Sequence, residues 1–283
     1  MTEQTYIVVG TDGSTHAANA VTWAAHEAQR LGVPLRIVTV FERWAEMRPG
    51  SDDVHTVEEQ HARGLLDQAR DTVLTRFPDL QVETELRSGE PEEELGRASA
   101  DAQLLVTGTR GRGGFTGMLL GSTSRSLTLR AVPPLVVVPG PLPPPAGPVV
   151  VGVDGSEEAK RALDFAAEQA NQRGVPLVAV QVLAEPPWFG PAEVYGVWVE
   201  DVRTLTQEAL DEELTPVRQR YPDLEIRTKV PRGHPAEELR RAADGAQLLV
   251  VGSRGRSVAR SMLLGSISHG VLHHAPCPVA VLT

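Results

Sequence analysis

Short apolar runs alternate with longer stretches of helical periodicity along the whole chain. In the first half, Ala18, Val21, Ala25 and Ala28 recur at helical spacing behind Ser14, a suitable N-cap, and Gly32 supplies a stop. The pattern predicts strands near Tyr6 to Gly10, Leu35 to Phe41, Gln81 to Arg87, Leu104 to Gly108 and Leu135 to Val138. Strands that alternate with helices indicate an α/β fold with a parallel sheet covered on both faces.

The second half repeats the first. Gly10-Thr11-Asp12-Gly13-Ser14 returns 142 residues later as Gly152-Val153-Asp154-Gly155-Ser156. Beyond the second strand the offset becomes 144, so that Gly121-Ser122 matches Gly265-Ser266. The repeat predicts two copies of one domain, and Ser156, Ala162, Phe165 and Gly174 reproduce the first helix.

A proline-rich stretch from Pro139 to Pro148 separates the copies and is typical of a stiff, extended spacer. We therefore expect one domain over residues 1–140, a linker over 141–148 and a second domain over 149–283. Each domain has an ordinary size.

The composition of the chain limits the classes of function and partner that we expect. The chain has 283 residues, 27 basic against 37 acidic side chains and a net charge of −10, which disfavours nucleic acids and anionic membrane surfaces as partners. Its apolar runs are too short to cross a bilayer, and its acidic N-terminus does not resemble a signal peptide, so we expect a cytoplasmic protein. One cysteine, Cys277, excludes an intrachain disulfide and a multi-cysteine metal site.

The glycine-rich loop after the fourth strand is the main candidate for chemistry. It begins Gly108-Thr109-Arg110-Gly111 and ends at Gly121-Ser122, where a helix is expected to start. Bare backbone N–H groups and a helix N-terminus favour a phosphate, and the arginines of the loop favour an anion in an acidic chain. A tight turn without a ligand is the alternative. The loop lacks the Gly-Lys-Ser/Thr of a P-loop and the spacing of a dinucleotide fingerprint.

The spacing Gly-x2-Gly-x9-Gly-Ser/Thr, present in both copies, resembles that of the ATP-binding universal stress proteins. The aspartate after the first strand and the run Met118-Leu119-Leu120-Gly121-Ser122 resemble the same family, as does His273-His274-Ala275-Pro276-Cys277-Pro278. The resemblance covers nearly the whole chain. It implies the strand order 3-2-1-4-5, one ATP per domain, with or without Mg²⁺, and dimerisation through the last strand.

The resemblance also implies a set of site residues in each copy. Asp12 and Asp154 would meet the adenine and ribose, Gly10 and Gly152 would let the nucleotide approach, and Val40 and Val182, each at the end of a second strand, would pack on the adenine. The other ATP-binding residues expected in the first domain are Gly108, Thr109, Arg110, Gly111, Arg112, Gly113, Gly114, Gly121, Ser122 and Thr123. In the second domain they are Gly252, Ser253, Arg254, Gly255, Arg256, Ser257, Val258, Gly265, Ser266 and Ile267.

These expectations describe a nucleotide-dependent regulator of stress or growth arrest that works as a homodimer and signals to a protein partner. The alternatives are a slow ATPase, a phosphoryl- or adenylyl-transfer enzyme, and a scaffold that nucleotide merely stabilises. No dedicated base is evident beside the motif, so we assign no catalytic residue. His269 and His273 superficially resemble a metal site, but histidines in a last helical turn also interact favourably with the helix dipole, and we expect no metal centre.

Overall fold

A computed structural model describes residues 6–41, 52–111, 120–130, 132–143, 146–184, 192–255 and 265–283 of the chain. These residues form two compact units, of which the first ends at Leu142 and the second runs from Pro143 to Leu282. Each unit is an α/β domain.

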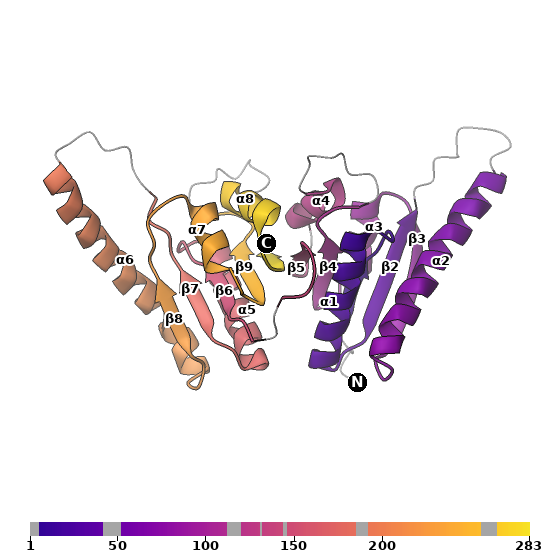
Figure 1. Cartoon of the computed structure of the whole chain (residues 1–283), viewed down its shortest axis with the longest axis horizontal. Coiled ribbons are helices and arrows are strands. Elements are labelled where there is room, and N and C mark those ends of the chain that lie inside the picture. Colours follow the sequence, from indigo (N-terminus) through magenta and orange to yellow (C-terminus); the bar gives the residue numbers. More distant parts are fainter. Residues whose placement is uncertain are drawn as a thin grey trace. The chain divides into compact units, whose positions relative to one another are not determined.

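The first unit contains a five-stranded parallel sheet in the order β3-β2-β1-β4-β5. Helices α1 and α2 cover one face, and α3 and α4 cover the other (Figure 1). The elements are β1 (Ile7–Gly10), α1 (Thr15–Leu31), β2 (Leu35–Phe41), α2 (Asp52–Arg76), β3 (Val82–Ser88), α3 (Pro91–Ala98), β4 (Leu104–Gly108), α4 (Ser122–Arg130) and β5 (Leu135–Val138). The expected strands are therefore confirmed to within one residue at each end.

The second unit has the same topology, with the strand order β8-β7-β6-β9-β10 and parallel pairing throughout. Its elements are β6 (Val149–Gly152), α5 (Glu157–Arg173), β7 (Leu177–Val180), α6 (Ala192–Arg220), β8 (Ile226–Lys229), α7 (Pro235–Ala242), β9 (Leu248–Gly252), α8 (Ser266–His274) and β10 (Val279–Leu282). Both units thus have the expected 3-2-1-4-5 order.

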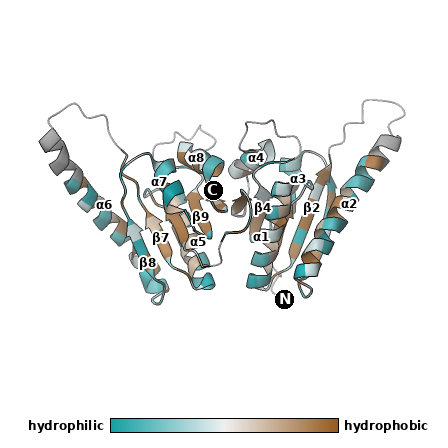
Figure 2. Ribbon diagram, viewed as in Figure 1, coloured by the Kyte–Doolittle hydropathy of each residue, from teal (hydrophilic) through white to brown (hydrophobic). Residues whose placement is uncertain are grey.

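The cores lie in the central strands, which are apolar on both faces because helices cover both (Figure 2). In the first unit Ile7, Val8 and Val9 of β1 are fully buried. The inner face of α1 is rich in alanine, which lets the helix lie close to the sheet. Of the four apolar residues at helical spacing, Val21, Ala25 and Ala28 are buried, whereas Ala18 is exposed and its neighbour Ala17 belongs to the buried face.

The caps of α1 and α5 confirm the predicted start and stop signals. Ser14 and Ser156 are the N-caps, and their hydroxyls accept hydrogen bonds from the third helical N–H at 3.2 and 3.1 Å. Gly32 and Gly174 end the helices in the left-handed conformation, with φ of 67° and 63°. These caps fix where each helix begins relative to the strand before it.

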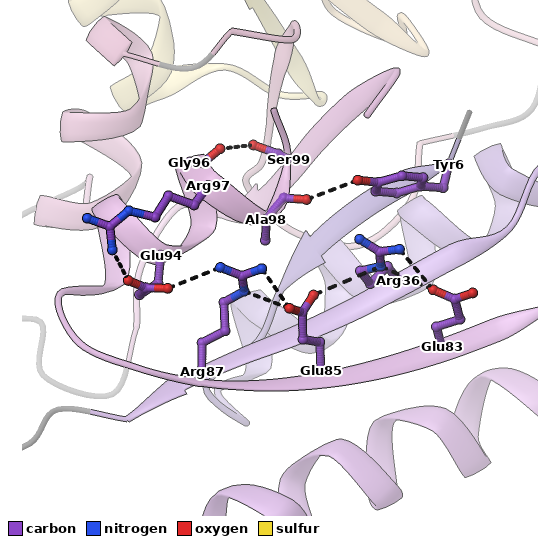
Figure 3. Close-up of polar contacts among 10 residues, drawn as sticks. All are labelled: Tyr6, Arg36, Glu83, Glu85, Arg87, Glu94, Gly96, Arg97, Ala98 and Ser99. Atoms are coloured by element: carbon purple, nitrogen blue, oxygen red, sulfur yellow. Dashed lines mark hydrogen bonds and ion pairs between the residues drawn. The ribbon is translucent and has the colours of Figure 1, made fainter. Parts of the chain in front are cut away.

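An ion-pair network ties the edge strand β3 to its neighbours in the first unit (Figure 3). Arg36 of β2 contacts Glu83 at 3.1 Å, and Arg87 contacts Glu85 at 2.7 Å and Glu94 of α3 at 3.1 Å. Charged side chains on an edge strand also disfavour pairing with another chain. The second unit has Pro231 at the position that corresponds to Arg87, so this network belongs to the first domain.

Candidate functional site

The aspartate after the first strand is held by the turn that leads into the first helix of each domain. The Oδ1 atom of Asp12 accepts a hydrogen bond from the N–H of Ser14 at 3.0 Å, and Asp154 accepts one from Ser156 at 3.0 Å. Gly13, which lies between Asp12 and Ser14, has φ of 78°, in the left-handed region that favours glycine. The local sequence therefore places each carboxylate beside the N-terminus of a helix.

The same carboxylates meet the glycine-rich loop. A Cβ atom at Gly111 would lie 2.5 Å from Oδ2 of Asp12, and one at Gly255 would lie 2.5 Å from Oδ2 of Asp154. Such separations are closer than Cβ atoms tolerate, so the second glycine of each loop leaves room for the carboxylate. The structure thus brings together, in both domains, two motifs that are about 100 residues apart in sequence.

The two ends of each loop are joined by backbone hydrogen bonds. The N–H of Gly121 donates to the carbonyl of Thr109 at 2.6 Å, and that of Gly265 donates to the carbonyl of Ser253 at 2.9 Å. The next helix is fastened to the same strand end, since the hydroxyl of Ser124 donates to the carbonyl of Gly108 at 2.7 Å. Ser268 makes the corresponding bond at 2.6 Å. Helices α4 and α8 therefore begin directly beside the loop, where their N-termini favour an anion.

The arginines of the two loops have different surroundings. In the first domain the Nε atom of Arg110 is buried and has no hydrogen-bond partner in the described part of the chain. In the second domain Arg254 forms an ion pair with Glu158, with 3.2 Å between Nη2 and Oε1. Buried donors usually have a partner. The Arg110 guanidinium is thus a candidate for contact with a bound anion.

The first glycine of each loop allows a strand to approach a helix. A Cβ atom at Gly108 would lie 2.7 Å from the carbonyl carbon of His16 in α1, and one at Gly252 would lie 2.8 Å from Cβ of Glu158 in α5. This close approach places the first turn of α1 or α5 against the start of the loop. His16 and Glu158 are residues that the motif did not indicate, although the repeat offset aligns them with each other.

The glycines at the end of the first strand have a packing role in the structure. A Cβ atom at Gly10 would lie 3.0 Å from Cδ1 of Leu95, and one at Gly152 would lie 3.1 Å from Cδ1 of Leu239. Both leucines are buried residues of α3 and α7. The absence of a side chain therefore lets these helices pack on the sheet, and it does not need a ligand to explain it.

The remaining expected site residues fall into three groups. Val40 lies half-buried in β2, whereas Val182 lies two residues beyond the end of β7, so its assignment to a strand end was wrong. Beyond Val180, the N–H of Gln181 still donates to the carbonyl of Lys229 at the end of β8, and the N–H of Leu183 donates to the carbonyl of Pro231 after β8. Thr109 and Ser253 are buried, Ser122 and Ser266 are exposed, and Thr123 and Ile267 are half-buried. Outside the described residues lie Arg112, Gly113, Gly114, Arg256, Ser257 and Val258.

Comparison with known proteins decides the family. The model of the universal stress protein family matches this chain twice, over residues 5–139 and 146–283. The chain belongs to the universal stress protein family.

Full-length relatives agree with this assignment. A universal stress protein of Mycolicibacterium smegmatis is 38% identical over 288 residues, which cover 98% of this chain and 96% of the relative. One from Mycobacterium tuberculosis is 34% identical over 300 residues, which cover 97% and 94% of the two chains. The crystal structure of a universal stress protein from Archaeoglobus fulgidus has a TM-score of 0.73 at 21% identity and covers 99% of this chain and 96% of its own. That likeness supports the fold, and the mycobacterial relatives support a tandem universal stress protein.

Other features of this universal stress protein bear on the alternatives. His269 and His273 of α8 lie with their Nε2 atoms 3.2 Å apart. In the described ranges, no group of three or more His, Cys, Asp or Glu side chains is arranged to hold a metal ion. Burial raises the pKa of the Cys277 thiol to about 12, which makes it a poor nucleophile. None of the helices in the described segments is both long and apolar enough to span a bilayer.

Proposed function

We propose that each domain binds one ATP molecule and that the chain is a nucleotide-dependent regulator of stress response or growth arrest. The observation that carries the proposal is the close approach of the first-strand carboxylate to the second glycine of the loop. In each domain a Cβ atom at that glycine would lie 2.5 Å from the carboxylate Oδ2. A turn that only joined a strand to a helix would not require a carboxylate against its second glycine.

The chemistry of the site suits a nucleoside phosphate. At one end, Asp12 or Asp154 offers carboxylate oxygens that can accept hydrogen bonds from ribose hydroxyls. At the other end, the helix N-terminus at Ser122 or Ser266 and the loop arginine offer positive charge for phosphates. The buried Nε of Arg110, which has no partner in the described residues, is an atom that a phosphate oxygen would satisfy.

A magnesium ion would fit this site as a companion of the phosphates. Mg²⁺ prefers oxygen ligands, keeps several waters and is commonly held by one or two carboxylates plus phosphate oxygens. Asp12 and Asp154 are the carboxylates that this arrangement places against the loop. Such a site holds a nucleotide in its ground state, and that favours a regulator over a fast enzyme.

Direct binding tests the proposal. Nucleotide released from the denatured protein is expected to be adenine nucleotide, and titration of nucleotide-free protein with ATP is expected to give about two sites per chain, with GTP as the comparison. Gly111→Ala should remove the first site and Gly255→Ala the second, because each new methyl group would displace the carboxylate from the loop. Gly64→Ala is the matched control, since a Cβ there meets no atom within 4 Å.

Two outcomes would contradict the proposal. If neither ATP nor ADP bound to the folded protein, or if both glycine variants kept the native stoichiometry, the sites would be assigned wrongly. If the protein hydrolysed ATP at a steady-state rate on the order of 10 per second, it would be an ATPase and not a regulator of this kind.

A further inference from the structure

We infer that Glu158 weakens phosphate binding in the second domain, so that the two sites of one chain fill at different nucleotide concentrations. This inference rests on the proposed function and adds a regulatory property to it. It is carried by a difference between two corresponding sites. The Nε atom of Arg110 in the first loop has no hydrogen-bond partner among the described residues, whereas Arg254 in the second loop is paired with a carboxylate.

Glu158 lies next to the glycine-rich loop of the second domain. It lies in the first turn of α5, two residues after the N-cap Ser156. Its Cβ would be 2.8 Å from a Cβ at Gly252, the glycine at which the loop leaves β9. Its carboxylate reaches Arg254 of the loop at 3.2 Å, and only 20% of the Glu158 side chain is exposed. The charge is therefore held against the start of the loop.

The first domain has no negative charge at the same place. The residue that corresponds to Glu158 is His16, and the first turn of α1 has no acidic residue. The loop of this domain is fastened differently, because the hydroxyl of Ser14 donates to the carbonyl of Arg110 at 3.3 Å. In the second domain the hydroxyl of Ser156 donates to Asp154 at 2.6 Å. The Nε atom of Arg110 is buried and has no hydrogen-bond partner in the part of the chain that the structure describes.

The pairing has a direct electrostatic consequence. A phosphate that binds Arg254 must share that guanidinium with Glu158 and must lie near its negative charge. Glu158 also already interacts with the positive end of the α5 dipole, which would otherwise attract the phosphate. Because the carboxylate is partly exposed, we expect about a ten-fold loss of ATP affinity relative to a neutral residue there.

The effect should be confined to the phosphates. Adenosine has none, so its binding to the second site should not depend on Glu158. Each added phosphate should raise the affinity less in the second domain than in the first. A chain with one stronger and one weaker site would respond to nucleotide over two concentration ranges.

Calorimetric titration of the full chain with ATP and with adenosine tests the inference. We expect Glu158→Gln to tighten ATP binding at the second site by about ten-fold at low ionic strength, to change adenosine binding little, and to lose its effect in high salt. Glu157→Gln is the matched control: it removes the same charge one residue away, where the carboxylate is exposed and pairs with Lys160 at 2.7 Å. It should change ATP binding much less.

Single-site variants assign the effect to a domain. In Gly111→Ala protein, which retains the second site, Glu158→His should tighten ATP binding by installing the residue that the first domain has there. In Gly255→Ala protein, His16→Glu should weaken ATP binding at the first site. Should a glycine variant fail to fold, the two binding phases of the Glu158→Gln protein in the native background give the same comparison.

The experiments distinguish a failure of the Glu158 inference from a failure of the proposed nucleotide binding. Equal ATP affinity at both sites, unchanged by Glu158→Gln, would overturn the inference and leave nucleotide binding in place. Tightening by Glu157→Gln to the same extent would also overturn it, because a general charge effect would then explain the result. Absence of ATP and adenosine binding in every variant would instead overturn the proposed function.

Discussion

Gly108 is the position where we expect a single added methyl group to have the largest effect on the first domain. A Cβ there would lie 2.7, 2.8 and 2.9 Å from the carbonyl carbon and oxygen of His16 and the nitrogen of Ala17, whereas ordinary contacts lie at 3.4–4 Å. All three atoms belong to the backbone of α1, so no side-chain rotation can relieve the overlap. Helix α1 or the end of β4 must move by at least several tenths of an ångström.

The size of this effect follows from the packing of α1. The helix is fixed by its cap Ser14 and by a buried face that includes Trp23, which is 5% exposed, so it cannot shift without opening the core. Overpacking usually costs about 1–3 kcal/mol, and a collision with three backbone atoms places Gly108→Ala near the upper end, at about 3 kcal/mol. For a domain of this size that corresponds to a fall in Tm of roughly 10 °C.

Urea and thermal unfolding followed by circular dichroism would measure this change, and hydrogen exchange would assign it to a domain. Exchange should increase in α1 and β4 and remain native in α5 and β9. Gly64→Ala, a substitution into open space within α2, should be neutral or stabilise by up to about 1 kcal/mol. If Gly108→Ala changed stability by less than about 0.5 kcal/mol, the close approach of β4 and α1 would not be what requires glycine at this position.

Two further predictions concern titrating groups. Burial raises the pKa of Cys277 to about 12 from the ordinary value of 9.0, so the unfolded thiol ionises first as the pH rises. This group should therefore lower the free energy of unfolding above about pH 9. In urea titrations the Cys277→Ser protein should lack this part of the pH dependence, and the native thiol should resist alkylation that modifies the unfolded protein rapidly. Burial and then the nearby charge of Arg76 lower the pKa of His26, whose Nε2 is buried with no partner among the described residues. The unfolded state therefore takes up the proton first, and the free energy of unfolding should fall as the pH drops below 6.5. His26→Gln should flatten this pH dependence of the free energy of unfolding between about pH 7 and 5. An unchanged slope would show that another group causes the pH dependence.

Features that depend on neighbours along the chain can be predicted from the sequence alone. The duplication, the strand-helix alternation and the start and stop of α1 at Ser14 and Gly32 follow from spacing, capping and glycine conformation, which act within a few residues. The strand order was implied by the family resemblance and is confirmed in each domain. The two loops could be recognised in the same way, because their glycines recur at a fixed spacing.

The charges and surfaces that meet can be identified only in the folded protein. Arg110 and Arg254 look equivalent in sequence, yet Arg254 is paired with Glu158, which is 96 residues away, and Nε of Arg110 has no partner in the described ranges. Likewise, Gly10 resembles a ligand-facing glycine in sequence but accommodates Leu95. Such contacts depend on the register of the sheet and on how closely a helix approaches a strand end. A spacing pattern in the sequence predicts neither the register nor the distance of approach, because both are fixed only when distant segments pack together.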